Sequence, residues 1–162
     1  MDSRPYLGKA GQLAVMAELA FLGYNVSIPE VDKGDDVFAV NDETGNMYRL
    51  QVKTATAFKQ KESHRCQFSL RVDQLEKAHT PELHYCFTAK IEEKWEFIVV
   101  TRTVLQHLVS VDDIGTKAKL KSGKESLTLT ITFQDDGRCT CSKKDLQTYR
   151  NNWSQTWPSL KT

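Results

Sequence analysis

The most informative part of the sequence is Asp32-Lys33-Gly34-Asp35-Asp36-Val37, taken together with Gln51-Val52-Lys53, which begins fifteen residues after Asp36. If residues 48–55 form a strand, Gln51 and Lys53 project from one face, and their apolar neighbours project into a core from the other. An acidic residue at the start of one strand then lies beside an amide and an amine on the next.

This combination of side chains suits phosphodiester hydrolysis. Carboxylate and amide oxygens are ligands for a hard cation such as Mg²⁺. An ammonium group can stabilise a phosphate or position an attacking water. The plainer alternative is a solvated Asp/Gly turn beside a surface strand lysine.

The segment before the acidic turn predicts a helix followed by a strand. Ala, Leu and Met dominate residues 13–22 without an internal proline, and Gly23 is a suitable C-terminal cap. The helical spacing of Leu13, Met16, Ala17 and Ala20 predicts that these four residues face the sheet. Residues 24–28 then form a strand that ends at Pro29, and a turn over 41–46 leads into the Gln-x-Lys strand.

The rest of the chain is rich in predicted strands. We expect strands at 66–72, 83–91, 95–101 and 126–133, a helical turn at 73–77 and a short helix at 104–109. In 126–133, Leu127, Leu129, Ile131 and Phe133 alternate with polar residues, which predicts one buried face. The spacing of Tyr149, Trp153 and Trp157 predicts a C-terminal helix over 146–160, stopped by Pro158.

Over roughly residues 8–100, the order of these motifs resembles the PD-(D/E)XK nuclease superfamily. The resemblance rests on Gly8-x-x-Gly11-Gln12, on Gly23-Tyr24-Asn25-Val26, on the aspartate of the acidic turn and on Gln51-x-Lys53. The chain is similar to small prokaryotic endonucleases of this superfamily, including homing and restriction-like or resolvase-like enzymes. The resemblance implies an α/β (α+β) fold with a restriction-endonuclease-like core, in which helices flank a central mixed β-sheet.

The resemblance also implies a set of site residues. Asp36 and Gln51 would hold Mg²⁺, for which Mn²⁺ can substitute, and Lys53 would orient water or stabilise developing charge. Gln12 stands where the family has a helix glutamate, and Gln51 stands where aspartate or glutamate is commoner. Asp35 is the reserve metal ligand if the register is one residue off. Glu18 is the reserve carboxylate on the helix, although it lies about 240° further round than Gln12.

Length and composition fit one globular domain. The 162 residues are 40% hydrophobic and 27% charged, so we expect a single nuclease-like domain over 1–162, with core motifs in 8–100 and a C-terminal extension in 101–162. No apolar run approaches the roughly 18–20 residues of a membrane span, and the N-terminus lacks a secretory apolar region. We therefore expect a cytoplasmic protein, and the resemblance implies a prokaryotic one.

The expected partner is DNA, although the net charge of +1 does not by itself indicate a nucleic-acid binder. Two runs of basic residues are candidates for phosphate contacts. The first is Lys59, Lys61 and Arg65, and the second is Lys117, Lys119 and Lys121. A solvated strand edge is the alternative for each single lysine. Because one small site cuts one strand at a time, double-strand cleavage implies a homo-oligomer, a dimer or a tetramer.

The four cysteines and four histidines favour no metal site. His64-x-Cys66, His84-x-Cys86 and Cys139-x-Cys141 lack the usual two-to-four-residue zinc spacing, so we expect buried thiols and no zinc. The sequence thus favours a Mg²⁺-dependent endodeoxyribonuclease. The competing class is a non-catalytic nucleic-acid-binding or protein-interaction module on a degenerate nuclease scaffold, because only one strong carboxylate is present.

Overall fold

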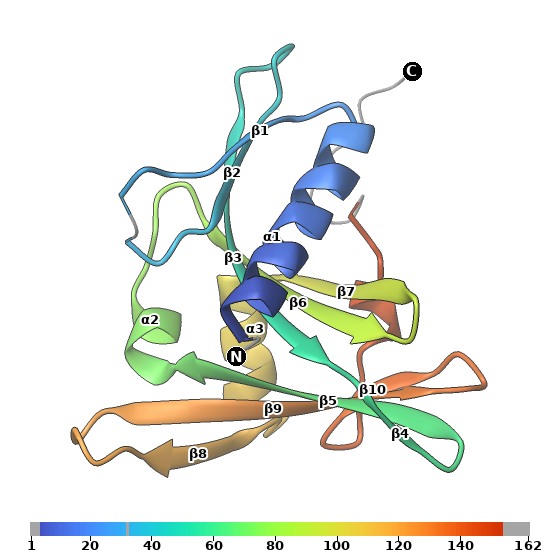
Figure 1. Cartoon of the computed structure of the whole chain (residues 1–162). Coiled ribbons are helices and arrows are strands. Elements are labelled where there is room, and N and C mark those ends of the chain that lie inside the picture. Colours follow the sequence, from blue (N-terminus) through green and yellow to red (C-terminus); the bar gives the residue numbers. More distant parts are fainter. Residues whose placement is uncertain (1–3, 32, 154–162) are drawn as a thin grey trace.

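The computed structural model describes residues 4–31 and 33–153 (Figure 1). The helices are α1 (Arg4–Phe21), α2 (Val72–Glu76), α3 (Arg102–Ser110) and the 3₁₀ turn η1 (Gln147–Tyr149). The strands are β1 (Asn25–Ser27), β2 (Val37–Val40), β3 (Met47–Thr56), β4 (Phe58–Gln60), β5 (Ser63–Arg71), β6 (Leu83–Ile91), β7 (Lys94–Thr101), β8 (Thr116–Lys119), β9 (Glu125–Gln134), β10 (Cys139–Cys141) and β11 (Lys144–Asp145).

The strands form two sheets. The first sheet has the order β1-β2-β3-β6-β7 and is mixed, because β3 and β6 run parallel while its other neighbours are antiparallel. The second sheet is antiparallel with the order β11-β10-β9-β5-β4, and β8 also pairs with β9. The predicted α+β fold with a central mixed sheet and flanking helices is confirmed.

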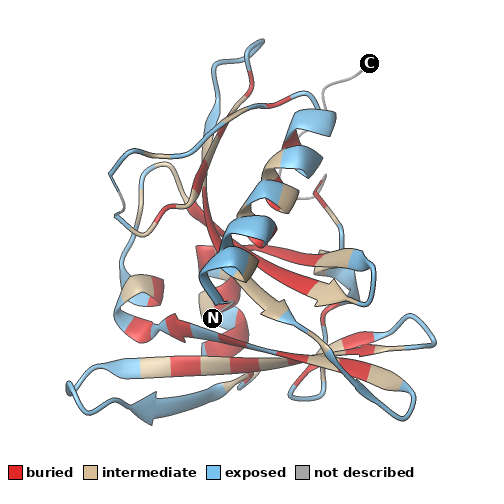
Figure 2. Cartoon of the chain, in the orientation of Figure 1, coloured by how far each residue is buried: buried red, intermediate tan, exposed pale blue. Residues whose placement is uncertain are grey.

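The first sheet is covered on both faces. In β6 every residue from Leu83 to Ala89 is buried, as expected for a central strand with a parallel neighbour. One face packs against α1, and the other packs against the second sheet, α2 and α3. Figure 2 shows this as buried β6 and β7 behind a helix whose outer side is exposed. The molecule therefore has three layers, and β3 lies between two cores.

The predicted buried face of α1 is wrong for Leu13, Ala17 and Ala20, which are exposed, whereas Met16 packs against the core as predicted. Gly11, Val15 and Leu19 are the buried residues, whereas Leu13 is 51% exposed. A Cβ added to Gly11 would lie 2.1 Å from Thr54 Oγ1, so the glycine allows α1 to approach β3 closely. Because α1 carries small and apolar residues on several faces, the apolar spacing alone did not fix its rotation.

The predicted C-terminal helix is also wrong within the described residues. After η1 the backbone reaches a positive φ of 50° at Asn151, whose N–H donates to the Phe97 carbonyl at 2.7 Å. Trp153 then packs on Phe97 with ring centroids 5.3 Å apart. These contacts tie the segment to the edge of β7, and they favour an extended path over a helix. Trp157 and Pro158 lie outside the described residues.

The chain after residue 101 is built into the fold. β9 pairs with β5 over nine residues, and its alternating buried residues join the core beside the first sheet, as the spacing in 126–133 predicted. Of the helices in the described part of the chain, none has the length and hydropathy required to span a membrane.

Candidate functional site

Asp36 lies where β2 starts to pair with β3. Its backbone N–H donates to the Leu50 carbonyl at 2.7 Å, and the regular ladder begins at the next residue. The Asp36 carboxylate turns back to β3, where one oxygen, Oδ2, accepts from the Val52 N–H at 2.7 Å and from Gln51 Nε2 at 2.7 Å. The carboxylate thus accepts a hydrogen bond from the Val52 N–H, which lies beyond the end of the ladder between β2 and β3.

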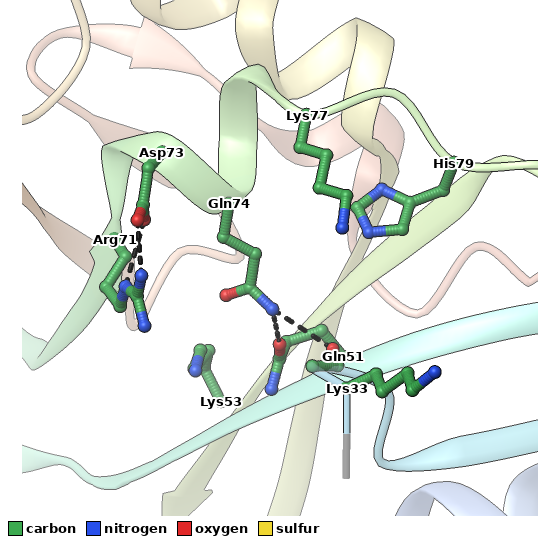
Figure 3. A pocket seen from close by; sticks show the side chains of 9 residues that line it. Lys33, Gln51, Lys53, Arg71, Asp73, Gln74, Lys77 and His79 are labelled. Carbon is green, nitrogen blue, oxygen red and sulfur yellow. Dashed lines mark hydrogen bonds and ion pairs between the residues drawn. The ribbon is translucent and has the colours of Figure 1, made fainter.

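The side chains of β3 alternate as predicted. Leu50 and Val52 enter the core beneath α1, whereas Gln51 and Lys53 line a polar pocket on the opposite face. This pocket encloses about 600 Å³ and is lined by Lys33, Gly34, Gln51, Lys53, Arg71, Asp73, Gln74, Lys77 and His79. Figure 3 shows these side chains arriving from β3, from the acidic turn, from the end of β5 and from α2 with its following loop. Basic groups outnumber acidic ones, which suits a phosphate.

Gln12 approaches Asp36 from α1. Gln12 Nε2 donates to the Asp36 main-chain carbonyl, and Lys9 Nζ donates to Gln12 Oε1 at 2.9 Å. Gln12, Asp36 and Val52 line a second hollow of about 270 Å³. Asp36 therefore connects the two hollows, because it lines the smaller one and bonds to Gln51 in the larger one.

The reserve residues have other surroundings. Asp35 is only 4% exposed and forms an ion pair with Arg49 Nη2 at 2.6 Å. Glu18 is exposed on α1, six residues beyond Gln12. Asp32 lies outside the described residues. The acidic turn is therefore not a simple solvated cluster, since its two described aspartates each have a specific partner.

Sequence reasoning missed Gln74, although it touches the central residue of the site. Gln74 Nε2 donates to Gln51 Oε1 and, at 3.1 Å, to the Gly34 carbonyl. The predicted helical turn at 73–77 located Gln74 on a helix, but only long-range packing brings that helix to β3. Beside it, Arg71 binds Asp73, and this hydrogen bond lowers the pKa of Asp73.

The two predicted basic runs are placed apart. Lys59, Lys61 and Arg65 belong to the β4–β5 hairpin, where Lys59 forms an ion pair with Asp135 at 3.2 Å. Lys117 and Lys119 share one face of exposed β8, and Lys121 is in the turn after it. Figure 1 shows β4 and β8 at opposite ends of the second sheet. The structure brings neither run into the polar pocket.

The site offers one carboxylate from the predicted set, Asp36. Among the residues that the structure describes, no three His, Cys, Asp or Glu side chains gather as a metal-binding group. The four cysteines are buried, and none of them forms a disulfide. Burial raises the pKa of the Cys66, Cys86 and Cys139 thiols to about 12, so they stay protonated at neutral pH.

No family model and no curated protein matches this chain. Among solved structures, the chain is similar to "a bacterial homing endonuclease: I-Ssp6803I", with a TM-score of 0.56 and 19% sequence identity. The alignment covers 96% of this chain and 92% of that chain. At this level of identity the similarity is one of fold, and it extends over both sheets and the N-terminal helix.

Proposed function

We propose that this protein is a metal-dependent DNA endonuclease of the PD-(D/E)XK type that hydrolyses phosphodiester bonds. One observation carries the proposal: the Asp36 carboxylate bonds to Gln51 at 2.7 Å, and Gln51 shares a cation-lined pocket with Lys53. The similarity in fold to a homing endonuclease supports it.

The donor atoms suit Mg²⁺ in kind. The Asp36 carboxylate and the amide oxygens of Gln51 and Gln12 are hard ligands, and Mg²⁺ is usually held by one or two carboxylates with waters and substrate phosphates. With one carboxylate from the chain, DNA phosphates would complete the site. The bound ion would polarise the phosphoryl group and lower the pKa of its water.

The side chains of the site would then have separate roles. Asp36 would anchor the ion, and Gln12 would steady the Asp36 backbone through the bond to its carbonyl. Lys53 would stabilise charge that develops on the phosphate, because an ammonium aimed at that charge lowers the barrier more than it strengthens substrate binding. Lys33 and Lys77 at the pocket would contact neighbouring phosphates.

The basic runs at the two ends of the second sheet are proposed as outer DNA contacts. The β4–β5 hairpin carries Lys59, Lys61 and Arg65, and the β8 region carries Lys117, Lys119 and Lys121. Cleavage of both strands would require a second copy of the chain, so we propose a dimer or a tetramer.

A binding module that does not cut DNA is the second candidate. It is favoured by the orientation of two amides, because both Gln12 and Gln51 direct nitrogen, not oxygen, toward Asp36. In this case the Asp36 carboxylate would serve only to accept hydrogen bonds from the Val52 N–H and from Gln51 Nε2.

Incubation of supercoiled plasmid with the protein in Mg²⁺, in Mn²⁺ and in chelator separates the two candidates. The endonuclease proposal predicts nicking that requires the metal and is lost in Lys53→Ala, while Lys94→Ala, at the exposed first residue of β7, retains it. Binding without metal-dependent cleavage would support the binding module instead. Absence of both binding and cleavage would contradict both candidates.

A further inference from the structure

Gln51 belongs to a chain of three side chains whose hydrogen-bond polarity is fixed from one end. We define the amide chain as Gln74, Gln51 and Asp36. It starts at the Gly34 carbonyl, which is only an acceptor and so requires the NH₂ group of Gln74. The same NH₂ donates to Gln51 Oε1, and Gln51 Nε2 therefore faces the Asp36 carboxylate.

The packing around Gly34 keeps the Gln74 amide in this place. Gly34 has a positive φ of 97°, and a Cβ there would lie 2.2 Å from Gln74 Nε2. In the middle of the amide chain, Gln51 is only 6% exposed. Gln74 lies on α2, and two buried residues of this helix, Val72 and Leu75, hold it against the core. The orientation of Gln51 is thus set by a backbone carbonyl and a helix that are both far from it in sequence.

This polarity is opposite to the one that a metal requires. A cation on Asp36 would attract the Gln51 oxygen and repel the NH₂ hydrogens, which now point at the carboxylate. To present its oxygen there, the Gln51 amide must turn over and give up its bond from Gln74. Gln74 must then either rotate away from the Gly34 carbonyl or leave Gln51 unpaired.

We propose that Gln74 is a positioning residue that holds Gln51 in a metal-excluding orientation, so that the site becomes competent only when Gln51 turns over. This inference rests on the proposed metal-dependent function and adds its control. The carbonyl of Gly34 and the helix α2 therefore regulate metal affinity, although neither supplies a ligand.

The test is Mg²⁺ binding by calorimetry in wild type and in Gln74→Met. Methionine keeps the length and the helix propensity of glutamine but cannot hydrogen-bond Gln51. Release of one neutral hydrogen bond should tighten Mg²⁺ binding by roughly fivefold. Gln74→Ala should tighten it similarly, and Gln67→Met, on the exposed face of β5, should leave it unchanged. A role in support of the folded site predicts the opposite, namely weaker binding in both Gln74 variants.

Nuclear magnetic resonance tests the orientation without metal or activity. In metal-free wild type, the Gln51 side-chain NH₂ should show a nuclear Overhauser effect to the Val52 N–H, because both donors converge on Asp36 Oδ2. The effect should weaken in Gln74→Met and disappear in saturating Mg²⁺. An unchanged effect in Gln74→Met would overturn the proposal.

The outcomes distinguish this inference from the proposed function. Metal-dependent nicking with equal Mg²⁺ affinity in wild type and Gln74→Met would overturn the role of Gln74 and leave the nuclease standing. Tighter Mg²⁺ binding in Gln74→Met without nicking by any variant would support the role of Gln74 and contradict the nuclease. Absence of Mg²⁺ binding in every variant would overturn both.

Discussion

Replacement of Gln51 by glutamate should make the stability of the protein depend on pH and on Mg²⁺. In the wild-type protein Gln51 Nε2 lies 2.7 Å from Asp36 Oδ2, and the side chain of Gln51 is almost fully buried. Gln51→Glu puts a second carboxylate oxygen in place of that nitrogen. A favourable hydrogen bond becomes a contact between like charges.

The size of the effect follows from the separation between the centres of the two carboxylate charges. Two unit charges about 4 Å apart repel by ~4 kcal/mol at an effective dielectric constant of about 20. The bond from Gln74, neutral in the wild type, would become charge-assisted in the variant, and this gain would offset ~1 kcal/mol. The net cost of ~3 kcal/mol at pH 7 corresponds to a fall in Tm of roughly 9 °C for a chain of this length.

The cost should vanish in acid. Repulsion raises the folded-state pKa of the carboxyl pair above the unfolded value of about 4.3. Below that unfolded value both states are protonated and the penalty is absent, and it grows as the pH rises through the raised folded pKa. Mg²⁺ should recover stability, by about 2.7 kcal/mol at one hundred times its Kd, because it binds only the folded site.

Thermal unfolding of Gln51→Glu and of the control Gln67→Glu between pH 4 and pH 8, with and without Mg²⁺, measures this. Gln67 is exposed on β5, so its glutamate variant should unfold close to wild type at every pH. If the two variants had the same pH profile and the same response to Mg²⁺, Gln51 would not face Asp36, and the geometry of the site would be wrong.

Three further predictions concern other parts of the molecule. Asp36→Asn should abolish Mg²⁺ binding and lower the unfolding free energy by about 1–2 kcal/mol, because two charge-assisted hydrogen bonds become neutral. Denaturant titration measures the loss of stability, and a variant as stable as wild type would contradict the prediction. Lys77→Ala should reduce the log–log salt slope of DNA affinity by about 0.9, whereas Lys143→Ala, in the β10–β11 turn, should not change it; equal slopes in fluorescence anisotropy would remove Lys77 from the interface. Because burial raises the pKa of Cys66 to about 12, its thiol should resist alkylation at pH 8. The unfolding free energy should fall as the pH rises above about 9, because the thiol ionises in the unfolded protein before it ionises in the folded one. Fast labelling of the native protein would show that Cys66 is accessible and contradict the prediction.

Several strands could be predicted because their sequences contain strong local signals. β9 alternates Leu127, Leu129, Ile131 and Phe133 with polar residues, and the structure buries the apolar four. β6 and β7 were predicted within one residue at each end, since the turn between them is charged. The acidic turn leads directly into β2, which pairs with the Gln-x-Lys strand β3, so their sequence order was enough to place Asp36 beside Gln51.

The rotation of α1 and the partners of the site could not be predicted in the same way. Several faces of α1 are apolar, and the close approach of Gly11 to Thr54, which selects Val15 and Leu19, is a property of packing. Gln74 is 23 residues from Gln51, and nothing local in the sequence directs it there. The sequence likewise left open a solvated acidic turn, whereas Asp35 is buried in an ion pair with Arg49 in the folded protein.

A Mn²⁺ titration followed by nuclear magnetic resonance tests whether Asp36 and Gln51 hold the metal. The Val52 N–H donates to the Asp36 carboxylate at 2.7 Å, so the paramagnetic ion should broaden the Val52 amide at the lowest Mn²⁺ concentration. Excess Mg²⁺ should reverse the broadening, and Asp36→Asn should abolish it. Broadening that begins elsewhere, or that persists in Asp36→Asn, would contradict the assignment of this site.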